Sequence, residues 1–152
     1  MKIVDRPALT VVGLQIRTTP MSPDIPALWP RFVARMPEVE AVLEPRVSYG
    51  VVHNNAAGGA GFDYLAAVSV DASAALPPGM TRLELPAGRY ACFSYPLSRL
   101  GEGFCEVFER LLPASEFVQA AGPLFERYGE DFCPDESDSP VEIWLPVAPR
   151  IR

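Results

Sequence analysis

The sequence predicts an α+β fold of two pseudo-symmetric strand-helix-strand-strand units. Together they form an antiparallel sheet with the helices on one face and a ligand groove at the seam between the units. One observation is repetition: Pro7-Ala8 recurs as Pro86-Ala87, and Tyr49-Gly50 recurs as Tyr128-Gly129 at the same offset. A constant offset indicates an internal repeat, approximately 1–75 and 80–152. The second observation is that each half contains short apolar segments with strand composition and one segment with helical spacing.

The elements of the first half follow in order. Residues 9–16 are rich in β-branched side chains, which indicates a strand. A helix follows, with Pro26 and Pro30 confining its start, because proline lacks an N–H. Its buried stripe has the spacing of Ile25, Leu28, Trp29, Phe32, Val33 and Met36. Residues 46–52 and 62–70 predict two strands, joined by a glycine-containing hairpin loop at 53–61.

The second half repeats this order. Residues 81–85 and 89–95 have strand composition, and 86–88 predict a bend between them. Helical spacing follows in Phe104, Val107, Phe108, Leu111 and Leu112. Residues 124–128 and 141–147 predict the last two strands, with an acidic turn between them.

Composition limits the classes of function. At 152 residues, 49% of them hydrophobic, the chain 1–152 has the size and apolar content of a single domain with its own core. It carries 19 acidic and 13 basic residues, and Lys2 is the only lysine, so direct nucleic-acid binding is not expected. No apolar run reaches signal-peptide or membrane-helix length, which predicts a cytoplasmic protein. Three widely spaced cysteines and one histidine predict no metal site, and no cofactor is expected.

The segment PVEIWLPV at 140–147 contains the main candidate site residue. In a strand, Val141, Ile143 and Leu145 point to one face, while Glu142 and Trp144 point to the other. Glu142 is then either an ordinary surface acid or the base of a lined groove, and the strand alone leaves these alternatives equal. Further aromatic residues that lie on or beside predicted strands, and that we take as candidate ligand-binding residues, are Tyr49, Tyr64, Tyr90, Phe93, Phe104 and Tyr128.

A groove with aromatic walls and one carboxylate would suit a hydrophobic cation. Aromatic faces attract positive charge by about 0.5–2 kcal/mol each. A carboxylate at about 4 Å adds up to roughly 4 kcal/mol before desolvation is subtracted.

Four segments resemble the gyrase-inhibitor-like (GyrI-like) small-molecule-binding family. They are LPAGRYACF at 85–93, LLPAS at 111–115, GPLFERY at 122–128 and VEIWLPV at 141–147. This family includes effector-binding domains of AraC-type and MerR-type multidrug regulators. The resemblance implies the same two-unit fold and places the acid of the last strand, Glu142, in the ligand pocket. Because the sequence starts with the first strand, we expect no DNA-binding domain.

Three functions follow from these observations. The first is a stand-alone binding protein that holds hydrophobic, preferentially cationic, small molecules, with Glu142 as counter-charge. The second, implied by some family members, is a hydrolase of cyclopropane-bearing electrophiles that uses Glu142 as catalytic residue, with Tyr90 or Tyr128 as candidate partner. The third is an interaction protein that contacts gyrase or another basic partner. With no histidine or serine nucleophile motif beside Glu142, the residue types favour binding over catalysis. Neither the ligand nor the oligomeric state follows from the sequence.

Overall fold

The computed structural model describes residues 1–20, 22–54 and 61–151, which form one antiparallel sheet with two α-helices. Part of the hairpin loop predicted at 53–61 lies outside the described residues. The main sheet has the strand order β1-β6-β9-β8-β3-β4-β2-β5, and β7 pairs with β9. The strands are β1 (Lys2–Arg6), β2 (Leu9–Thr18), β3 (Ser48–His53), β4 (Phe62–Val70), β5 (Thr81–Leu85), β6 (Gly88–Pro96), β7 (Phe117–Gln119), β8 (Leu124–Tyr128) and β9 (Pro140–Pro149).

The two predicted units are present and lie side by side in the sheet. One unit is β2-α1-β3-β4 and the other is β6-α2-β8-β9, with α1 at Asp24–Arg35 and α2 at Leu100–Glu106. They meet where β3 pairs with β8, with Val51 opposite Phe125. The predicted strands at 62–70 and 124–128 match β4 and β8 in both bounds. The α+β fold with two repeated units is therefore confirmed.

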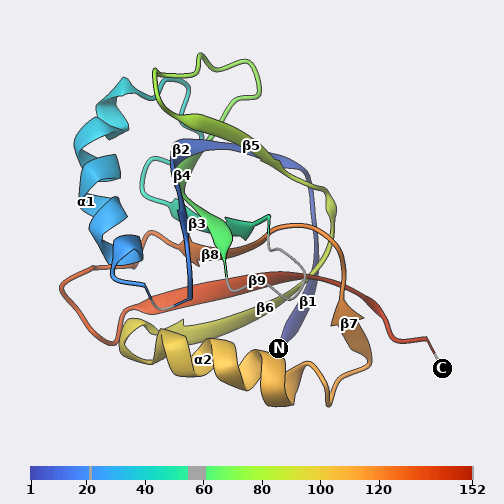
Figure 1. Cartoon of the computed structure of the whole chain (residues 1–152). Helices are drawn as coiled ribbons and strands as arrows, with labels where there is room; N and C mark the ends of the chain where they lie inside the picture. Colours follow the sequence, from blue (N-terminus) through green and yellow to red (C-terminus); the bar gives the residue numbers. More distant parts are fainter. Residues whose placement is uncertain (21, 55–60, 152) are drawn as a thin grey trace.

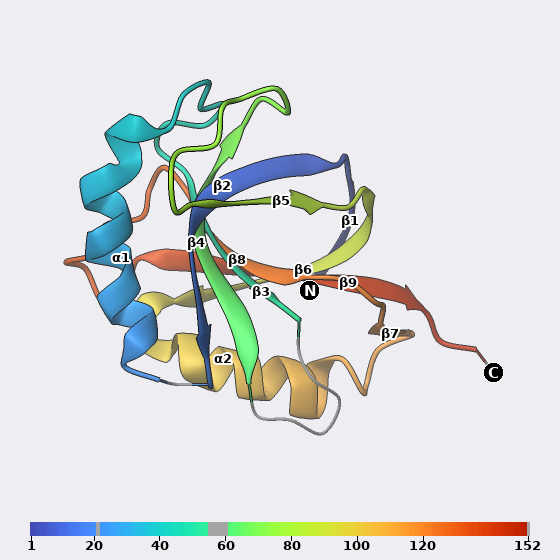
Figure 2. The same cartoon turned by 45° about the horizontal axis from the view of Figure 1, so that its top comes forward.

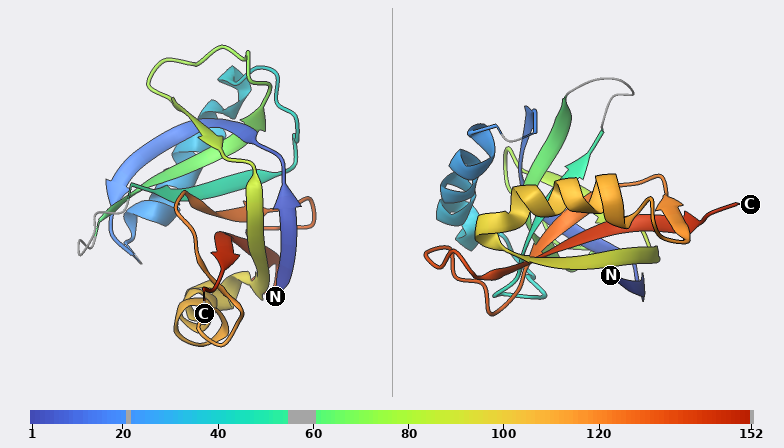
Figure 3. Two further views of the ribbon diagram at one scale, coloured as in Figure 1. Left: turned by 90° about the vertical axis from the view of Figure 1, so that its right-hand side faces the viewer. Right: turned by 90° about the horizontal axis from the view of Figure 1, so that it is seen from below.

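The edges of the sheet exchange partners between the two units. The short strand β1 pairs with β6 of the second unit, and β5 pairs with β2 of the first. Since β1 leads directly into β2 and β5 leads directly into β6, these pairings curl the sheet (Figures 1 and 2). Viewed from the side, β2 arches over the sheet while β1 and β6 run together (Figure 3). The sequence predicted β5 and the bend after it but missed β1.

Both helices cover the convex outer face of this curled sheet (Figures 1 and 3). Helix α1 buries Leu28 and Phe32, two residues of its predicted stripe. Pro30 lies inside the helix and not at its start, because the helix begins at Asp24. Helix α2 starts before its predicted stripe and continues as one π-helical segment at Val107–Leu111, where the Leu112 N–H donates to the Val107 carbonyl over 2.9 Å.

The core is divided by the sheet into an outer and an inner part. Under α1 and α2, two clusters of buried side chains fill the outer face. A third cluster fills the concave inner face, with these buried members: Val11, Val47, Tyr49, Val51, Leu65, Ala67, Leu85, Tyr90, Cys92, Phe125 and Trp144. This inner cluster joins strands from both units, so the concave face is where a site at the seam would form.

Among the described residues, no helix is long and apolar enough to cross a membrane. No group of three or more His, Cys, Asp or Glu side chains there is arranged to hold a metal ion. Of the three cysteines, which are all free, Cys92 is buried, Cys133 is half-buried and Cys105 is exposed.

Candidate ligand-binding site

Strand β9 alternates as predicted from the sequence. Ile143 and Leu145 pack into the outer cluster beside α2, whereas Trp144 packs into the inner cluster. Glu142 shares the face of Trp144, and the Trp144 indole N–H donates to the Glu142 carboxylate over 3.2 Å. The carboxylate therefore lies at the edge of the concave aromatic cluster, not isolated in solvent.

Four aromatic rings, which we call the aromatic box, converge on this concave face. They are Tyr49 on β3, Tyr90 on β6, Phe125 on β8 and Trp144 on β9. Phe125 and Trp144 are stacked, with centroids 6.0 Å apart and planes 9° from parallel. Tyr49 and Tyr90 each meet Phe125 edge-on, with centroids 5.7 Å apart. Such contacts contribute about 0.5–1.5 kcal/mol each beyond area burial, so the box is a rigid apolar surface.

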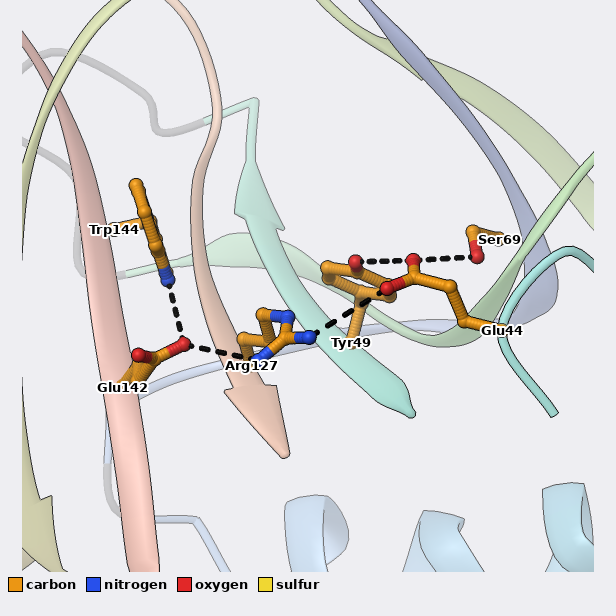
Figure 4. A network of polar contacts seen from close by, with 6 residues as sticks. All are labelled: Glu44, Tyr49, Ser69, Arg127, Glu142 and Trp144. Atoms are coloured by element: carbon orange, nitrogen blue, oxygen red, sulfur yellow. Dashed lines mark hydrogen bonds and ion pairs between the residues drawn. The ribbon is translucent and has the colours of Figure 1, made fainter. Parts of the chain in front are cut away.

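A polar network borders the aromatic box (Figure 4). Arg127 of β8 donates from Nη1 to Glu142 Oε1 over 3.2 Å, and its Nη2 lies 3.5 Å from Glu44 Oε2. One guanidinium thus lies between two carboxylates that come from different units of the fold (Figure 4). Both acids are about one-third exposed, so they stay accessible to a ligand at the rim of the box.

Glu44 is held in its ionised form by its neighbours. Its Oε1 accepts hydrogen bonds from the Tyr49 hydroxyl over 2.6 Å and from the Ser69 hydroxyl over 2.8 Å. Partial burial opposes ionisation of Glu44, but these bonds and the Arg127 charge outweigh it and hold the pKa below its usual value. The network therefore presents negative charge on the side of the box where Tyr49 lies.

A second guanidinium lies on the rings of the box. The Cζ atom of Arg6, from β1, is 4.5 Å from the centroid of the Trp144 ring and 5.2 Å from that of the Phe125 ring. Both distances are within the range of a cation–π contact. The concave face thus already binds one cation, which belongs to the chain itself.

The box also contains a thiol. Cys92 of β6 is paired in register with Trp144. Burial, together with the nearby charge of Glu142, raises the pKa of this thiol to about 11. The thiol is therefore neutral at neutral pH and acts as a small apolar side chain in the floor of the box.

The candidate residues predicted from the sequence divide between the two faces of the sheet. Glu142, Trp144, Tyr90 and Tyr49 come together on the concave face, as described above. Tyr64 and Tyr128 do not lie there: their hydroxyls both donate over 2.7 Å to Glu126, a buried acid on the α1 side. The prediction that these two tyrosines share one groove with Glu142 is corrected. Side chains alternate between the two faces along β4 and β8, and this alternation turns both tyrosines toward α1.

Phe93 and Phe104 also lie away from Glu142. Phe93 pairs in register with Ile143 of β9 and is buried in the outer cluster beside α2. Phe104 of α2 packs against this cluster from the helix side. The two phenylalanines are core residues that fix α2 on the sheet. In β6, the run of consecutive apolar residues 90–93 is buried on both faces, so no alternation of apolar and polar residues assigns Phe93 to a face.

Four residues of this region were missed by the sequence interpretation: Arg6, Glu44, Phe125 and Arg127. A signal existed for two of them, because alternation in the predicted strand 124–128 puts Phe125 and Arg127 on one face and Glu126 on the other. Arg6 and Glu44 had no comparable signal, since one lies in the unpredicted strand β1 and the other lies outside the strands.

A cleft of about 670 Å³ lies elsewhere, at the beginning of β8 and the end of β3. It is lined by residues such as His53, Glu84, Gln119 and Pro123, and its described lining contains no phenyl, phenol or indole ring. Leu83 lines this cleft and also packs against the inner cluster. The aromatic rings and the acids paired with Arg127 lie at the aromatic box and not in this cleft.

The chain resembles known proteins along nearly its whole length. Residues 1–148 match the family model of the GyrI-like small molecule binding domain. The transcriptional regulator BrlR of Pseudomonas aeruginosa is 32% identical over 149 residues, which cover 96% of this chain and 54% of BrlR. The chain therefore spans about half the length of this relative.

Solved structures share the fold at low sequence identity. The structure of SAV2435 bound to tetraphenylphosphonium superposes with a TM-score of 0.72 at 18% identity, covering 97% of this chain and 93% of the other. The EcmrR C-terminal domain gives a TM-score of 0.70 at 15% identity, with 98% and 97% covered. At these identities the likeness concerns the fold, whereas the family model concerns the sequence, and by that match this chain belongs to the GyrI-like small-molecule-binding domain family.

Proposed function

We propose that this protein binds hydrophobic aromatic cations at the aromatic box, with Glu142 and Glu44 supplying the negative charge. The observation that carries the proposal is the contact of the Arg6 guanidinium with the Phe125 and Trp144 rings. A surface that binds a cation of the chain has the electrostatics to bind a cation from solution, because both interactions use the same ring quadrupoles.

The rim of the box supports the same ligand class. Glu142 and Glu44 share one cationic partner, Arg127, so the three charged groups together carry a net negative charge. A cation placed on the rings beside Glu142 would reduce this excess. A neutral aromatic compound would gain the apolar contacts alone, which predicts a preference for cations of equal size.

The structural neighbour SAV2435, whose complex contains tetraphenylphosphonium, supplies a suitable probe. This cation combines four phenyl rings with one delocalised charge and therefore matches both features of the site. Triphenylphosphine oxide is a neutral control with the same kind of ring.

Isothermal titration calorimetry of both compounds tests the proposal. We expect saturable binding of tetraphenylphosphonium to the wild-type protein and weaker binding of triphenylphosphine oxide. Glu142→Gln should weaken binding of the cation by about 3- to 30-fold, since the lost charge is partly screened by water. The matched control Glu102→Gln removes an exposed acid of α2 that pairs with Arg99, and it should leave both affinities unchanged.

Equal weakening by Glu142→Gln and Glu102→Gln would show that only the net charge of the protein matters, and it would contradict a role for Glu142. The hydrolase and gyrase-binding hypotheses stay predictions. The hydrolase hypothesis requires that an electrophile incubated with the protein gain the mass of one water, and that Glu142→Gln abolish this gain.

A further inference from the structure

We propose that Arg6 is an internal competitor of the ligand: it closes the aromatic box in the ligand-free protein, and a ligand binds only by displacing its guanidinium from the rings. The inference rests on the proposed function, because it concerns the same box. It adds a residue that sets the affinity and selectivity of the site.

Exposure of the rings supports the closed state. Phe125 is 1% exposed and Trp144 is 8% exposed, although both belong to the concave face and carry no helix over them. The guanidinium of Arg6 lies over both rings, and Val4 of the same strand packs against the inner cluster. A ligand can therefore reach the ring faces only after the Arg6 side chain has moved.

The contacts of Arg6 are of a kind that a ligand can replace. Within residues 1–20, 22–54 and 61–151, no ion pair or side-chain hydrogen bond joins Arg6 to another group. Arg127, by contrast, is fixed between Glu44 and Glu142. An aromatic cation can reproduce the cation–π contacts that Arg6 gives up, and the released guanidinium regains its hydration in water.

The backbone confines the movement to the side chain. Arg6 precedes Pro7, and a residue before proline is restricted to extended conformations. Its partner in the β1–β6 ladder is Gly88, which has open space where a side chain would be. Arg6 is thus aimed at the box by an extended strand and is free to rotate out on the side of Gly88.

This arrangement predicts a selective site. Every ligand must replace the two ring contacts of Arg6, so a small cation with little apolar surface gains nothing on exchange. A large aromatic cation adds ring contacts that Arg6 lacks. Removal of Arg6 should therefore tighten binding of all aromatic ligands, whatever their charge.

The test is calorimetric titration of Arg6→Gln and Arg6→Lys with tetraphenylphosphonium and triphenylphosphine oxide. Arg6→Gln should bind both probes about tenfold more tightly than the wild-type protein. The affinities of Arg6→Lys for both probes should lie between those of the wild-type protein and of Arg6→Gln, because an ammonium group is more strongly hydrated than a guanidinium and leaves the rings more easily. Arg89→Gln is the matched control: it removes an exposed arginine of β6 that pairs with Asp5, and it should change neither affinity.

Three outcomes would overturn the inference. Unchanged or weaker binding of tetraphenylphosphonium by Arg6→Gln would show that Arg6 does not compete. Tighter binding of the cation alone would show that Arg6 acts only by charge repulsion. Absence of binding to both the wild-type protein and Arg6→Gln would contradict the proposed function as well.

A second measurement needs no ligand. In an NMR spectrum of the free protein, the side-chain protons of Arg6 should be shifted upfield by the Phe125 and Trp144 rings. Addition of tetraphenylphosphonium should return them to the positions of a solvated arginine. Ordinary shifts in the free protein would overturn the closed state, even if the cation binds and the proposed function holds.

Discussion

Glu126 and Arg127 are consecutive residues of β8 whose side chains belong to separate polar networks on opposite faces of the sheet. Glu126 accepts hydrogen bonds from Tyr64 and Tyr128 on the side of α1. Arg127 bridges Glu44 and Glu142 at the rim of the concave aromatic box. One network lies in the core and the other lies beside the aromatic box, the proposed ligand site, so substitutions in the two should have separable effects on stability and ligand binding.

Arg127→Met should change both properties, and in opposite directions. Glu44 and Glu142, each about one-third exposed, lose their shared partner, which should lower the free energy of unfolding by about 1–3 kcal/mol. The same acids gain uncompensated charge, which should tighten binding of tetraphenylphosphonium roughly fivefold to tenfold. Urea unfolding and calorimetry measure the two effects.

The control for this variant is Arg110→Met, which breaks an exposed pair with Glu106 on the outer surface. It should change the free energy of unfolding by no more than about 0.5 kcal/mol and leave ligand affinity unchanged. Weaker cation binding by Arg127→Met would contradict the assignment of the two acids to the ligand site.

Glu126→Gln should alter the pH dependence of stability. Burial raises the pKa of Glu126 above its usual value, although the two tyrosine hydroxyls favour its charged form. The folded protein then binds this proton more tightly than the unfolded chain, so Glu126 lowers stability as pH rises from the unfolded pKa through the folded one. The free energy of unfolding of the wild-type protein, relative to Glu126→Gln, should therefore fall over this range and then level off.

Glu38→Gln is a control with the opposite sign. Its hydrogen bond with Arg35 lowers the pKa of Glu38, so its contribution is present above the unfolded pKa and is lost as pH falls through the folded one. Urea unfolding of the three proteins at several pH values between about 3 and 8, roughly the range in which carboxyl groups with lowered, normal or raised pKa values titrate, measures these differences. A difference between wild type and Glu126→Gln that rises with pH would contradict a raised pKa for the buried Glu126 carboxyl group.

Gly50→Ala should destabilise the fold through the same core network. Gly50 lies on β3 beside the Tyr64 hydroxyl and the Glu126 carboxylate, and a Cβ atom there would overlap both groups. Forcing them apart should cost about 1–3 kcal/mol of unfolding free energy. Gly88→Ala meets open space and should change this free energy by at most about 0.5 kcal/mol. Equal stability of the two variants would contradict the close approach of the Tyr64 hydroxyl and the Glu126 carboxylate to Gly50.

Features that repeat or alternate were predictable from the sequence. The constant offset between the halves predicted two units, which the structure joins where β3 pairs with β8. Alternation in β9 predicted that Glu142 and Trp144 share a face. Both signals are local or periodic, so they need no knowledge of which distant strands pair.

The rest depended on pairing between distant segments. Asp5 and Arg6 interrupt the apolar run of β1, which becomes a strand because β6 pairs with it. Glu126 is a charged residue in the core, contrary to the usual preference of acids for the surface. The neighbouring apolar residues Leu124 and Phe125 point to opposite faces, so composition alone did not assign the tyrosines of β4 and β8 to the α1 side.

The most direct test of the account is the structure of the protein in complex with tetraphenylphosphonium. We predict that the cation lies on the Phe125 and Trp144 rings near Glu142, with the Arg6 side chain displaced from them. A cation bound instead in the cleft lined by His53, Glu84 and Gln119, with Arg6 still over the rings, would contradict the assignment of the aromatic box as the ligand site.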